Sequence, residues 1–511
     1  MAIQKTLELE YRLSDLPSAQ HRAGLAGLVL LMQWLAQRTK TRGQCKIVKL
    51  DQYSAVIQLD LAGLGILFDE LFAASWQPRK SDPQKKIAMP KGTFLADCDP
   101  SGEEKLWLAL WQEVVLTILR NKSTNRIGFV TRAEGRKTNE AEKIWGNLFA
   151  NSTEELSGTF LLGARAKNAE KVPFLSTMRH KFLLYFWPLV IEVYRVAGRD
   201  KDGRLKCSGY FIVIPDVSNL KLFCEVFPQM LLHRSTEKIG EKILKASLAS
   251  VSMEASFETM SKIHEHTPLR STETSREPSL LGVEVFQVDR PGQDIAIQDF
   301  SRVTIKPMLF EEYAKVNATT TNHLFRQQRL SNLIQGDPPL LGFLSLFCTA
   351  PVENTIGSYT FRQDSRAFFE QYIEENIPMP SSKKNPDNDS QESGRKVPRK
   401  SPESIEQAVY KMVSTYLTKR LEMKENLIWK GIKHDANKRA EYSEKKRAIA
   451  RTTFYSVRSR SDDDFVEYFT KTLCSVSQQM SEKGFLRIAQ TLFAEPEKIR
   501  TLTMVALAAQ G

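Results

Sequence analysis

The chain has 511 residues, 41% of them hydrophobic, which is enough for a sizeable core and, by length, favours roughly two to four domains. Lys and Arg number 72 against 60 Asp and Glu, a net charge of +12 that favours an acidic partner, either nucleic acid or an anionic membrane. The longest apolar runs, 182–191 and 340–348, are shorter than the ~20 residues of a membrane helix. We therefore expect no membrane partner, and nucleic acid is favoured.

The cysteines predict the redox compartment. All six lie far apart in the sequence and form no CxxC pair, unlike the clustered cysteines of a secreted disulfide framework. The charged start, residues 1–12, has no apolar segment typical of a signal peptide. The sequence thus predicts reduced thiols and a cytoplasmic location.

The N-terminal part has mixed periodicity. Alternating apolar and polar residues predict a strand at 7–13, and a continuous apolar pattern predicts a helix at 21–38. A further strand is expected at 46–59, and helices at 60–76 and 106–119.

The middle of the chain is predicted to contain two strand pairs. Residues 198–206 are expected to form the turn of one hairpin, and 281–288 pairs with 296–305 in another. Residues 218–248 are predicted to be helical, with a break at Pro228.

Residues 381–400 mark the clearest boundary. They contain no aromatic residue, and Val397 is their single aliphatic residue, a composition typical of a flexible linker. Residues 401–511 are patterned as helices throughout and are predicted to form a compact bundle. The predicted fold class is α+β: a mixed α/β region within residues 1–380, followed by a C-terminal all-helical bundle.

Motifs of the common catalytic classes are missing from the sequence. It has no GxxxxGK[ST] or GxGxxG phosphate loop and no GxSxG nucleophile elbow. His264 and His266 are close to each other but lack further zinc ligands nearby. The acidic run 462–464 could serve a nuclease, but acids at a helix start more often stabilise the helix N-terminus. We expect no catalytic site, no metal and no cofactor.

Two stretches concentrate positive charge. Residues 120–143 hold seven basic residues against three acids and are rich in Asn, Ser and Thr, which form loops and hydrogen-bond to phosphates and bases. Residues 430–460 hold ten basic residues against three acids. Aromatic residues that could stack on unpaired bases accompany this second stretch: Trp429, Tyr442, Phe454 and Tyr455. The alternatives are an ordinary surface loop for the first stretch and a solvated helix face for the second.

Four segments carry a resemblance to a known family. They are PSAQHRAGLAGLVLLM (17–32), ARAKNAEKVPF (164–174), HKFLLYFWPLV (180–190) and GYFIVIPDVSNL (209–220). Together they resemble the large subunit of type I CRISPR Cascade, in the Myxan-type family close to subtype I-B. The similarity spans most of residues 1–360 in order, and HRAGLAGL and FWP are its most specific pieces.

The resemblance implies a non-catalytic role. Such a subunit sits at the crRNA 5′ end beside the Cascade backbone subunits and the crRNA 5′-handle-binding subunit, and it recognises the PAM in target double-stranded DNA. It supports R-loop formation, holds the displaced non-target strand and docks a downstream effector, either a helicase-nuclease or a transposition machinery. The protein then reads the PAM and backbone shape, while guide pairing reads the sequence.

The bundle at 401–511 resembles the Cascade small subunit, which in related systems is made from an internal start within the large-subunit gene. Met379, or a codon near Val397, is a candidate for such a start.

The basic stretches supply the candidate site residues. We expect PAM-side contacts from Asn121, Lys122, Asn125, Arg126, Arg132, Arg136 and Lys137. We expect non-target-strand contacts from Lys430, Lys433, Lys438, Arg439, Lys445, Lys446, Arg447 and Arg451. A metal-dependent nuclease acting on the same DNA and a structural adaptor that only bridges subunits remain alternatives.

Overall fold

The computed structural model shows an α+β protein, as the sequence predicts. It describes residues 6–38, 45–79, 82–98, 106–120, 122–164, 173–199, 205–234, 248–267, 278–289, 296–304, 306, 309–374, 404–432 and 434–511. The chain divides into two compact units, Met1–Phe310 (unit 1) and Glu311–Gly511 (unit 2).

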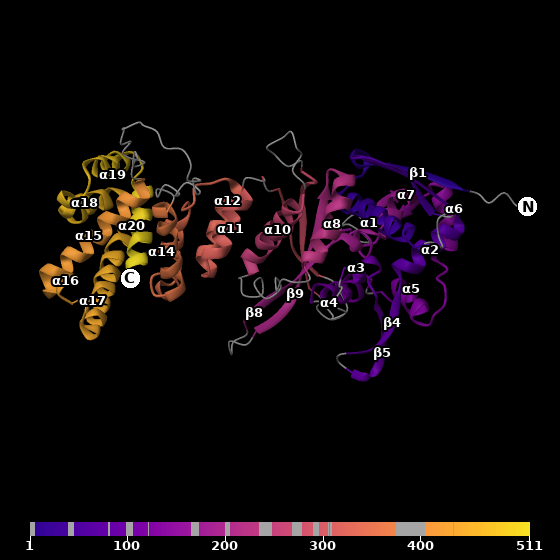
Figure 1. The fold of residues 1–511 in the computed structure, drawn as a ribbon, viewed down its shortest axis with the longest axis horizontal. Coiled ribbons are helices and arrows are strands. Elements are labelled where there is room, and N and C mark those ends of the chain that lie inside the picture. The colour runs from indigo at the N-terminus through magenta and orange to yellow at the C-terminus, as the bar shows by residue number, and fades with distance from the viewer. Residues whose placement is uncertain are drawn as a thin grey trace, which may run out of the picture. The chain divides into compact units, whose positions relative to one another are not determined.

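The sheets belong to unit 1. Its strands are β1 (Leu7–Arg12), β2 (Cys45–Leu50), β3 (Ser54–Leu59), β4 (Ala74–Arg79), β5 (Asp82–Pro90), β6 (Thr153–Glu155), β7 (Leu175–Thr177), β8 (Glu192–Arg199), β9 (Leu205–Val217), β10 (Leu280–Asp289) and β11 (Ala296–Val303). The described strands form antiparallel sheets in the orders β1-β3-β2 and β11-β10-β9-β8, besides the pairs β4-β5 and β6-β7 (Figure 1).

Helices cover these sheets. The helical elements of unit 1 are η1 (Leu13–Asp15), α1 (Ala19–Ala36), α2 (Leu61–Leu71), α3 (Phe94–Asp97), α4 (Leu106–Val114), the π-helical turn η2 (Val115–Leu119), α5 (Ser123–Ala133), α6 (Glu140–Ala150), α7 (Met178–Leu183), η3 (Trp187–Val190), α8 (Leu220–Arg234) and α10 (Leu248–Glu265). Helix α10 packs on the four-stranded sheet, and α1 packs between β9 and the short helix η3.

Most of the predicted elements are confirmed. The strand at 7–13 and the helix at 21–38 are β1 and α1. The hairpin around 198–206 is formed by β8 and β9. The strands at 281–288 and 296–305 are β10 and β11, which pair antiparallel.

The predictions for 46–59 and for a break at Pro228 are wrong. The single strand at 46–59 is split into β2 and β3, because the Asp51 carboxylate accepts hydrogen bonds from the backbone N–H groups of Tyr53 (2.9 Å) and Ser54 (2.7 Å) and closes a tight turn. The helix break at Pro228 does not occur, and α8 runs through the proline. The apolar residues that α8 buries on both sides of Pro228 outweigh the one hydrogen bond that a proline removes.

Two glycines bring α1 into backbone contact with the C-terminal end of α7 and the residues that follow it. A Cβ atom at Gly24 would overlap the carbonyl of Leu183, and one at Gly27 would overlap the carbonyl of Phe186. Both carbonyls belong to fixed, fully buried residues, so neither can move aside cheaply. The HRAGLAGL and FLLYFWP pieces of the sequence thus form one close-packed contact.

We predict that Gly24→Ala or Gly27→Ala lowers the free energy of unfolding of unit 1 by about 1–3 kcal/mol, because the added methyl group forces α1 away from this backbone. Gly65→Ala in α2 is the matched control, since a Cβ atom there meets nothing within 4 Å. It should leave stability unchanged or raise it by up to about 1 kcal/mol. Urea unfolding followed by circular dichroism measures both, and equal effects of the three substitutions would contradict the packing argument.

Unit 2 is helical throughout its described residues. Its elements are most of α11 (Leu309–Thr319), then α12 (His323–Gln335), α13 (Phe343–Thr349), η4 (Val352–Asn354), α14 (Tyr359–Glu374), α15 (Ile405–Glu425), α16 (Trp429–Ile432), α17 (Ala436–Arg458), α18 (Asp462–Thr472), η5 (Leu473–Gln479), α19 (Glu482–Ala494) and α20 (Pro496–Gln510). Helix α20, in yellow, lies among α14, α15 and α17 (Figure 1), and its residues from Ile499 to Ala509 are buried.

Local signals set the ends of these helices. Ser404 caps α15 in a reciprocal arrangement with Gln407, and Ser461 caps α18. Pro496 occupies the first turn of α20, where a proline costs no hydrogen bond.

Packing and composition mark different boundaries in this part of the chain. The buried phenylalanines of α12, α13 and α14 share one core with α15 and the helices that follow it. By packing, the division therefore falls at Phe310, whereas the linker predicted from composition at 381–400 lies outside the described residues.

Candidate nucleic-acid interface

The first basic stretch is a helix, not the loop that the sequence predicts. Helix α5 buries Phe129 against Phe72, with ring centroids 5.0 Å apart. Gly128 lies so close that a Cβ atom there would be 2.7 Å from the Phe72 ring. This packing overrides the weak helix propensity of the Asn, Ser and Thr residues in the stretch.

Arginines of this stretch hold α5 in place. Arg120 is buried, donates hydrogen bonds to the backbone carbonyls of Leu119, Thr159 and Leu184, and has its pKa lowered by burial to about 10. Arg126 Nε donates to the carbonyl of Arg120 (3.1 Å). Arg132 Nε donates to the carbonyl of Asp69 (3.1 Å), and its guanidinium lies 3.9 Å from the Asp69 carboxylate. These guanidinium groups therefore stabilise the fold of unit 1 through hydrogen bonds to its backbone carbonyls.

The other predicted PAM-side residues are differently placed. Lys122, Arg136 and Lys137 are exposed, and Asn125 is partly exposed. Arg136 forms an ion pair with Glu134. Asn121 lies outside the described residues. Lys122 immediately precedes α5, and Lys137 follows the last residue of α5 by four positions.

A hairpin that the sequence prediction missed adjoins α5. The helix predicted at 60–76 ends at Leu71, and β4 begins at Ala74. Helix α5 packs against β4 and β5, and Lys85 and Lys86 are exposed on this hairpin. Proline and basic residues interleaved in QPRKSDPQKK (77–86) were the available signal for an exposed turn.

We predict that Arg132→Ala lowers the free energy of unfolding of unit 1 by about 1–2 kcal/mol, because α5 loses its hydrogen bond to the Asp69 carbonyl and its ion pair with the Asp69 carboxylate in α2. Lys137→Ala removes an equal charge from an exposed position and should change stability by less than about 0.5 kcal/mol. Thermal unfolding of the two variants compares them directly. An Arg132→Ala protein as stable as the parent would show that Asp69 does not anchor α5.

The second basic stretch forms α16 and α17. Lys438 and Arg439 are exposed beside the N-terminus of α17, where Asp435 caps the helix. Lys433 and the side chain of Lys430 lie outside the described part of the chain. The described part of the stretch does not present one continuous row of exposed cations. Lys445 and Lys446 form ion pairs or hydrogen bonds within the protein, whereas Arg447 and Arg451 are exposed.

Lys445 and Lys446 are occupied within the protein. Lys445 forms ion pairs with Glu425 (2.8 Å) and Glu441 (2.9 Å), and these hydrogen-bonded carboxylates raise its pKa. Lys446 Nζ donates to Gln510 Oε1 (2.6 Å) at the end of α20, and burial lowers its pKa, as does the charge of Arg366.

Arg447 and Arg451 instead join two arginines of α14 that the sequence prediction missed. Burial lowers the pKa of Arg362, and the charges of Arg451, Arg447 and Arg366 lower it further. These four arginines, with Lys446, constitute what we call the α14–α17 basic cluster. Arg362 and Arg366 are separated by four residues on one helix, as are Arg447 and Arg451 on the other, so each pair shares a helix face.

Parts of the cluster are fixed by hydrogen bonds. Arg362 donates to the carbonyls of Ile356 (3.1 Å) and Gly357 (3.0 Å), and Arg366 donates to the carbonyl of Ala509 (3.1 Å) at the C-terminus of α20. Arg447 and Arg451 are exposed. Like charges held together in this way repel one another, and an anion bound among them would relieve the repulsion.

The aromatic residues of the stretch divide into core and surface. Phe454 and Tyr442 are buried, which agrees with the alternative that they face the core. Tyr455 is 49% exposed and follows Arg447 and Arg451 at four-residue spacing, on the same face of α17. Tyr359, 65% exposed, precedes Arg362 on α14, and the Arg362 guanidinium lies 5.9 Å from its ring centroid. Two exposed rings thus accompany the α14–α17 basic cluster.

The acidic run at the start of α18 is engaged in structure. Asp462 forms an ion pair with Arg500 (3.0 Å), and Asp464 accepts a hydrogen bond from the hydroxyl of its cap, Ser461 (2.7 Å). Among the residues that the structure describes, no three His, Cys, Asp or Glu side chains lie close enough to hold a metal ion.

No helix in the described ranges is long and apolar enough to cross a membrane.

Comparison with known protein families assigns the chain. The model of the type I-B CRISPR Cas8b N-terminal domain matches residues 84–273, and that of the type I-B CRISPR Cas8b C-terminal domain matches residues 280–510. A search of curated proteins gave no match. The N-terminal-domain match precedes the C-terminal-domain match in the sequence, and together they span most of it. The chain therefore belongs to the type I-B CRISPR Cas8b family, the large subunit of the type I-B Cascade.

Proposed function

We propose that this Cas8b chain is a non-catalytic DNA-binding subunit of a CRISPR surveillance complex that contains crRNA, the Cascade backbone subunits and a 5′-handle-binding subunit. It contacts PAM-side duplex DNA through the exposed cations around α5 and binds the displaced non-target strand at the α14–α17 basic cluster. It thereby supports R-loop formation, and it docks the downstream effector, a helicase-nuclease or transposition proteins.

The observation that carries this proposal is the α14–α17 basic cluster. Four arginines from two helices lie close enough for the charges of Arg451, Arg447 and Arg366 to lower the pKa of Arg362. A structural cation is normally paired, as Lys445 is with Glu425 and Glu441. Exposed arginines beside Tyr359 and Tyr455 match the combination of phosphate neutralisation and base stacking that binds unpaired strands.

We predict that Arg447→Ala with Arg451→Ala weakens binding of the non-target strand and makes the negative slope of log affinity against log salt shallower by about 1.4, because two phosphate contacts are lost from a single strand. Fluorescence anisotropy of the reconstituted complex on a preformed R-loop substrate measures both quantities. Lys445→Ala, on the same helix, is the control. Its charge is already neutralised by Glu425 and Glu441, so it should change the slope little.

Equal salt slopes for the double variant and the parent complex would contradict non-target-strand binding at the cluster. Such a result would leave the role of unit 1 on the PAM side open to a separate measurement.

We predict that Lys122→Ala with Lys137→Ala weakens binding of PAM-containing duplex. The negative slope of log affinity against log salt should become shallower by about 1.8, since each cation would neutralise one duplex phosphate. Filter binding of the complex to target duplex, with and without a PAM, measures the effect. Lys143→Ala is the matched control, because Lys143 is half-exposed but forms an ion pair with Glu140 (3.2 Å). An unchanged affinity and slope would rule out α5 as a DNA-contacting element.

A further inference from the structure

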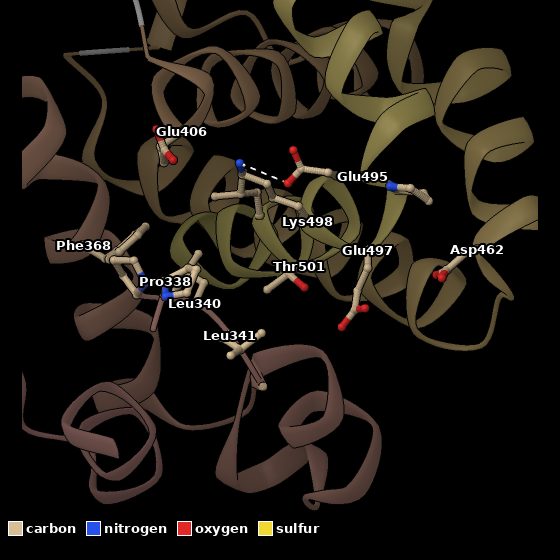
Figure 2. A pocket seen from close by; sticks show the side chains of 14 residues that line it. Pro338, Leu340, Leu341, Phe368, Glu406, Asp462, Glu495, Glu497, Lys498 and Thr501 are labelled. Carbon is tan, nitrogen blue, oxygen red and sulfur yellow. Dashed lines mark ion pairs between the residues drawn. The ribbon is translucent and has the colours of Figure 1, made fainter. Parts of the chain in front are cut away.

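Unit 2 contains a cleft of about 500 Å³ whose lining residues include none of the α14–α17 basic cluster. Residues 338–342 form one wall, with Phe368 of α14 beside Pro338 and Leu340, and the first two turns of α20 form another (Figure 2). Glu406 of α15 and Asp462 of α18 lie at opposite margins of the cleft. A volume of this size accommodates a few side chains of a bound ligand.

The apolar wall of the cleft is preformed. The side-chain amide of buried Asn332 donates hydrogen bonds to the carbonyls of Pro338 (3.1 Å), Pro339 (3.0 Å) and Leu341 (2.9 Å). With these carbonyls satisfied from behind, the apolar side chains face the cleft, and Leu341 is 49% exposed. Exposed apolar surface on a fixed wall is typical of a binding site, because the ligand does not have to order it.

The rim of the cleft is acidic, although the chain as a whole carries a net charge of +12. The lining residues include four carboxylates, those of Glu406, Asp462, Glu495 and Glu497. Glu495 forms an ion pair with Lys498 (3.3 Å), drawn as a dashed line in Figure 2, and Asp462 forms one with Arg500 (3.0 Å). The excess negative charge of the cleft therefore comes from Glu406 and Glu497. A phosphate backbone would be repelled here, whereas Lys or Arg side chains would be attracted.

We propose that this cleft docks a short basic segment of another protein subunit of the complex. An aliphatic or proline side chain of that segment packs against the apolar wall at residues 338–342. Lys or Arg residues on either side of it meet the carboxylates of the acidic rim. The combination of an apolar anchor with flanking cations follows from the two chemistries of the cleft.

A photocrosslink identifies the occupant. The exposed Leu341 is replaced by p-benzoylphenylalanine in the full chain, the complex is reconstituted from its purified subunits with crRNA, and the products of irradiation are sequenced by mass spectrometry. The expected product joins position 341 to a Lys- or Arg-rich segment of another subunit. A crosslink to this chain's own residues 375–403, a crosslink to nucleic acid, or no crosslink at all would each overturn the proposal.

Charge variants test the recognition chemistry. Glu406→Gln with Glu497→Gln should reduce the intersubunit crosslink about three- to tenfold, since each exposed ion pair contributes modestly. Glu482→Gln, in the first turn of α19 and outside the cleft, is the matched control and should leave the crosslink unchanged. A crosslink insensitive to the double variant would exclude charge-guided docking. DNA affinity, measured in parallel, should not change, which separates this site from the α14–α17 basic cluster.

Discussion

The contact between α1 and the backbone of residues 183–186, at and just after the end of α7, is the constraint on which unit 1 depends. Gly24 and Gly27 allow α1 to approach the carbonyls of Leu183 and Phe186 more closely than any residue with a Cβ atom could. The same buried segment accepts a hydrogen bond from Trp111 Nε1 at the carbonyl of Pro188 (2.5 Å). Its Leu184 carbonyl is also a hydrogen-bond acceptor for Arg120, whose own carbonyl holds Arg126 of α5. A series of direct contacts therefore connects the helix core to the surface helix proposed to meet duplex DNA. Because a densely packed interior resists deformation, the position of α5 depends on the packing of α1 against residues 183–186.

Burial decides which cations remain for an external partner. Arg120, Arg126 and Arg132 belong to the first basic stretch, yet their guanidinium groups donate to backbone carbonyls inside unit 1. In unit 2, Lys445 is neutralised by Glu425 and Glu441. A count of basic residues along the sequence thus overstates the charge that DNA would meet. Spatial proximity also adds charge that the count omits, since the arginines of α14 lie far in sequence from those of α17 and come near them only in the folded chain.

The sequence was informative wherever a local signal coincided with burial. The alternation at 7–13 predicted β1, and the acidic run 462–464 predicted the start of α18, because periodicity and charge at a helix terminus act over a few residues. Helix α5 was missed because Phe72, which lies more than fifty residues earlier, stabilises it against its own propensity. The charge of the stretch 430–460 was visible in the sequence. The participation of Arg362 and Arg366 was not, since nothing near them in the sequence distinguishes them from ordinary helix-surface arginines.

Helix α20 organises both proposed surfaces of unit 2. Its N-terminus carries partial positive charge and is flanked by Glu495 and Glu497 at the acidic cleft. Its C-terminus carries partial negative charge and is met by Arg366, on the carbonyl of Ala509, and by Lys446, on the side chain of Gln510. With 15 residues the helix is about 22 Å long, which exceeds the Debye length of about 8 Å at physiological salt. Surfaces of opposite charge can therefore coexist on one small unit without cancelling each other. One end of a single buried helix suits a basic protein segment, and the other end suits a nucleic-acid strand.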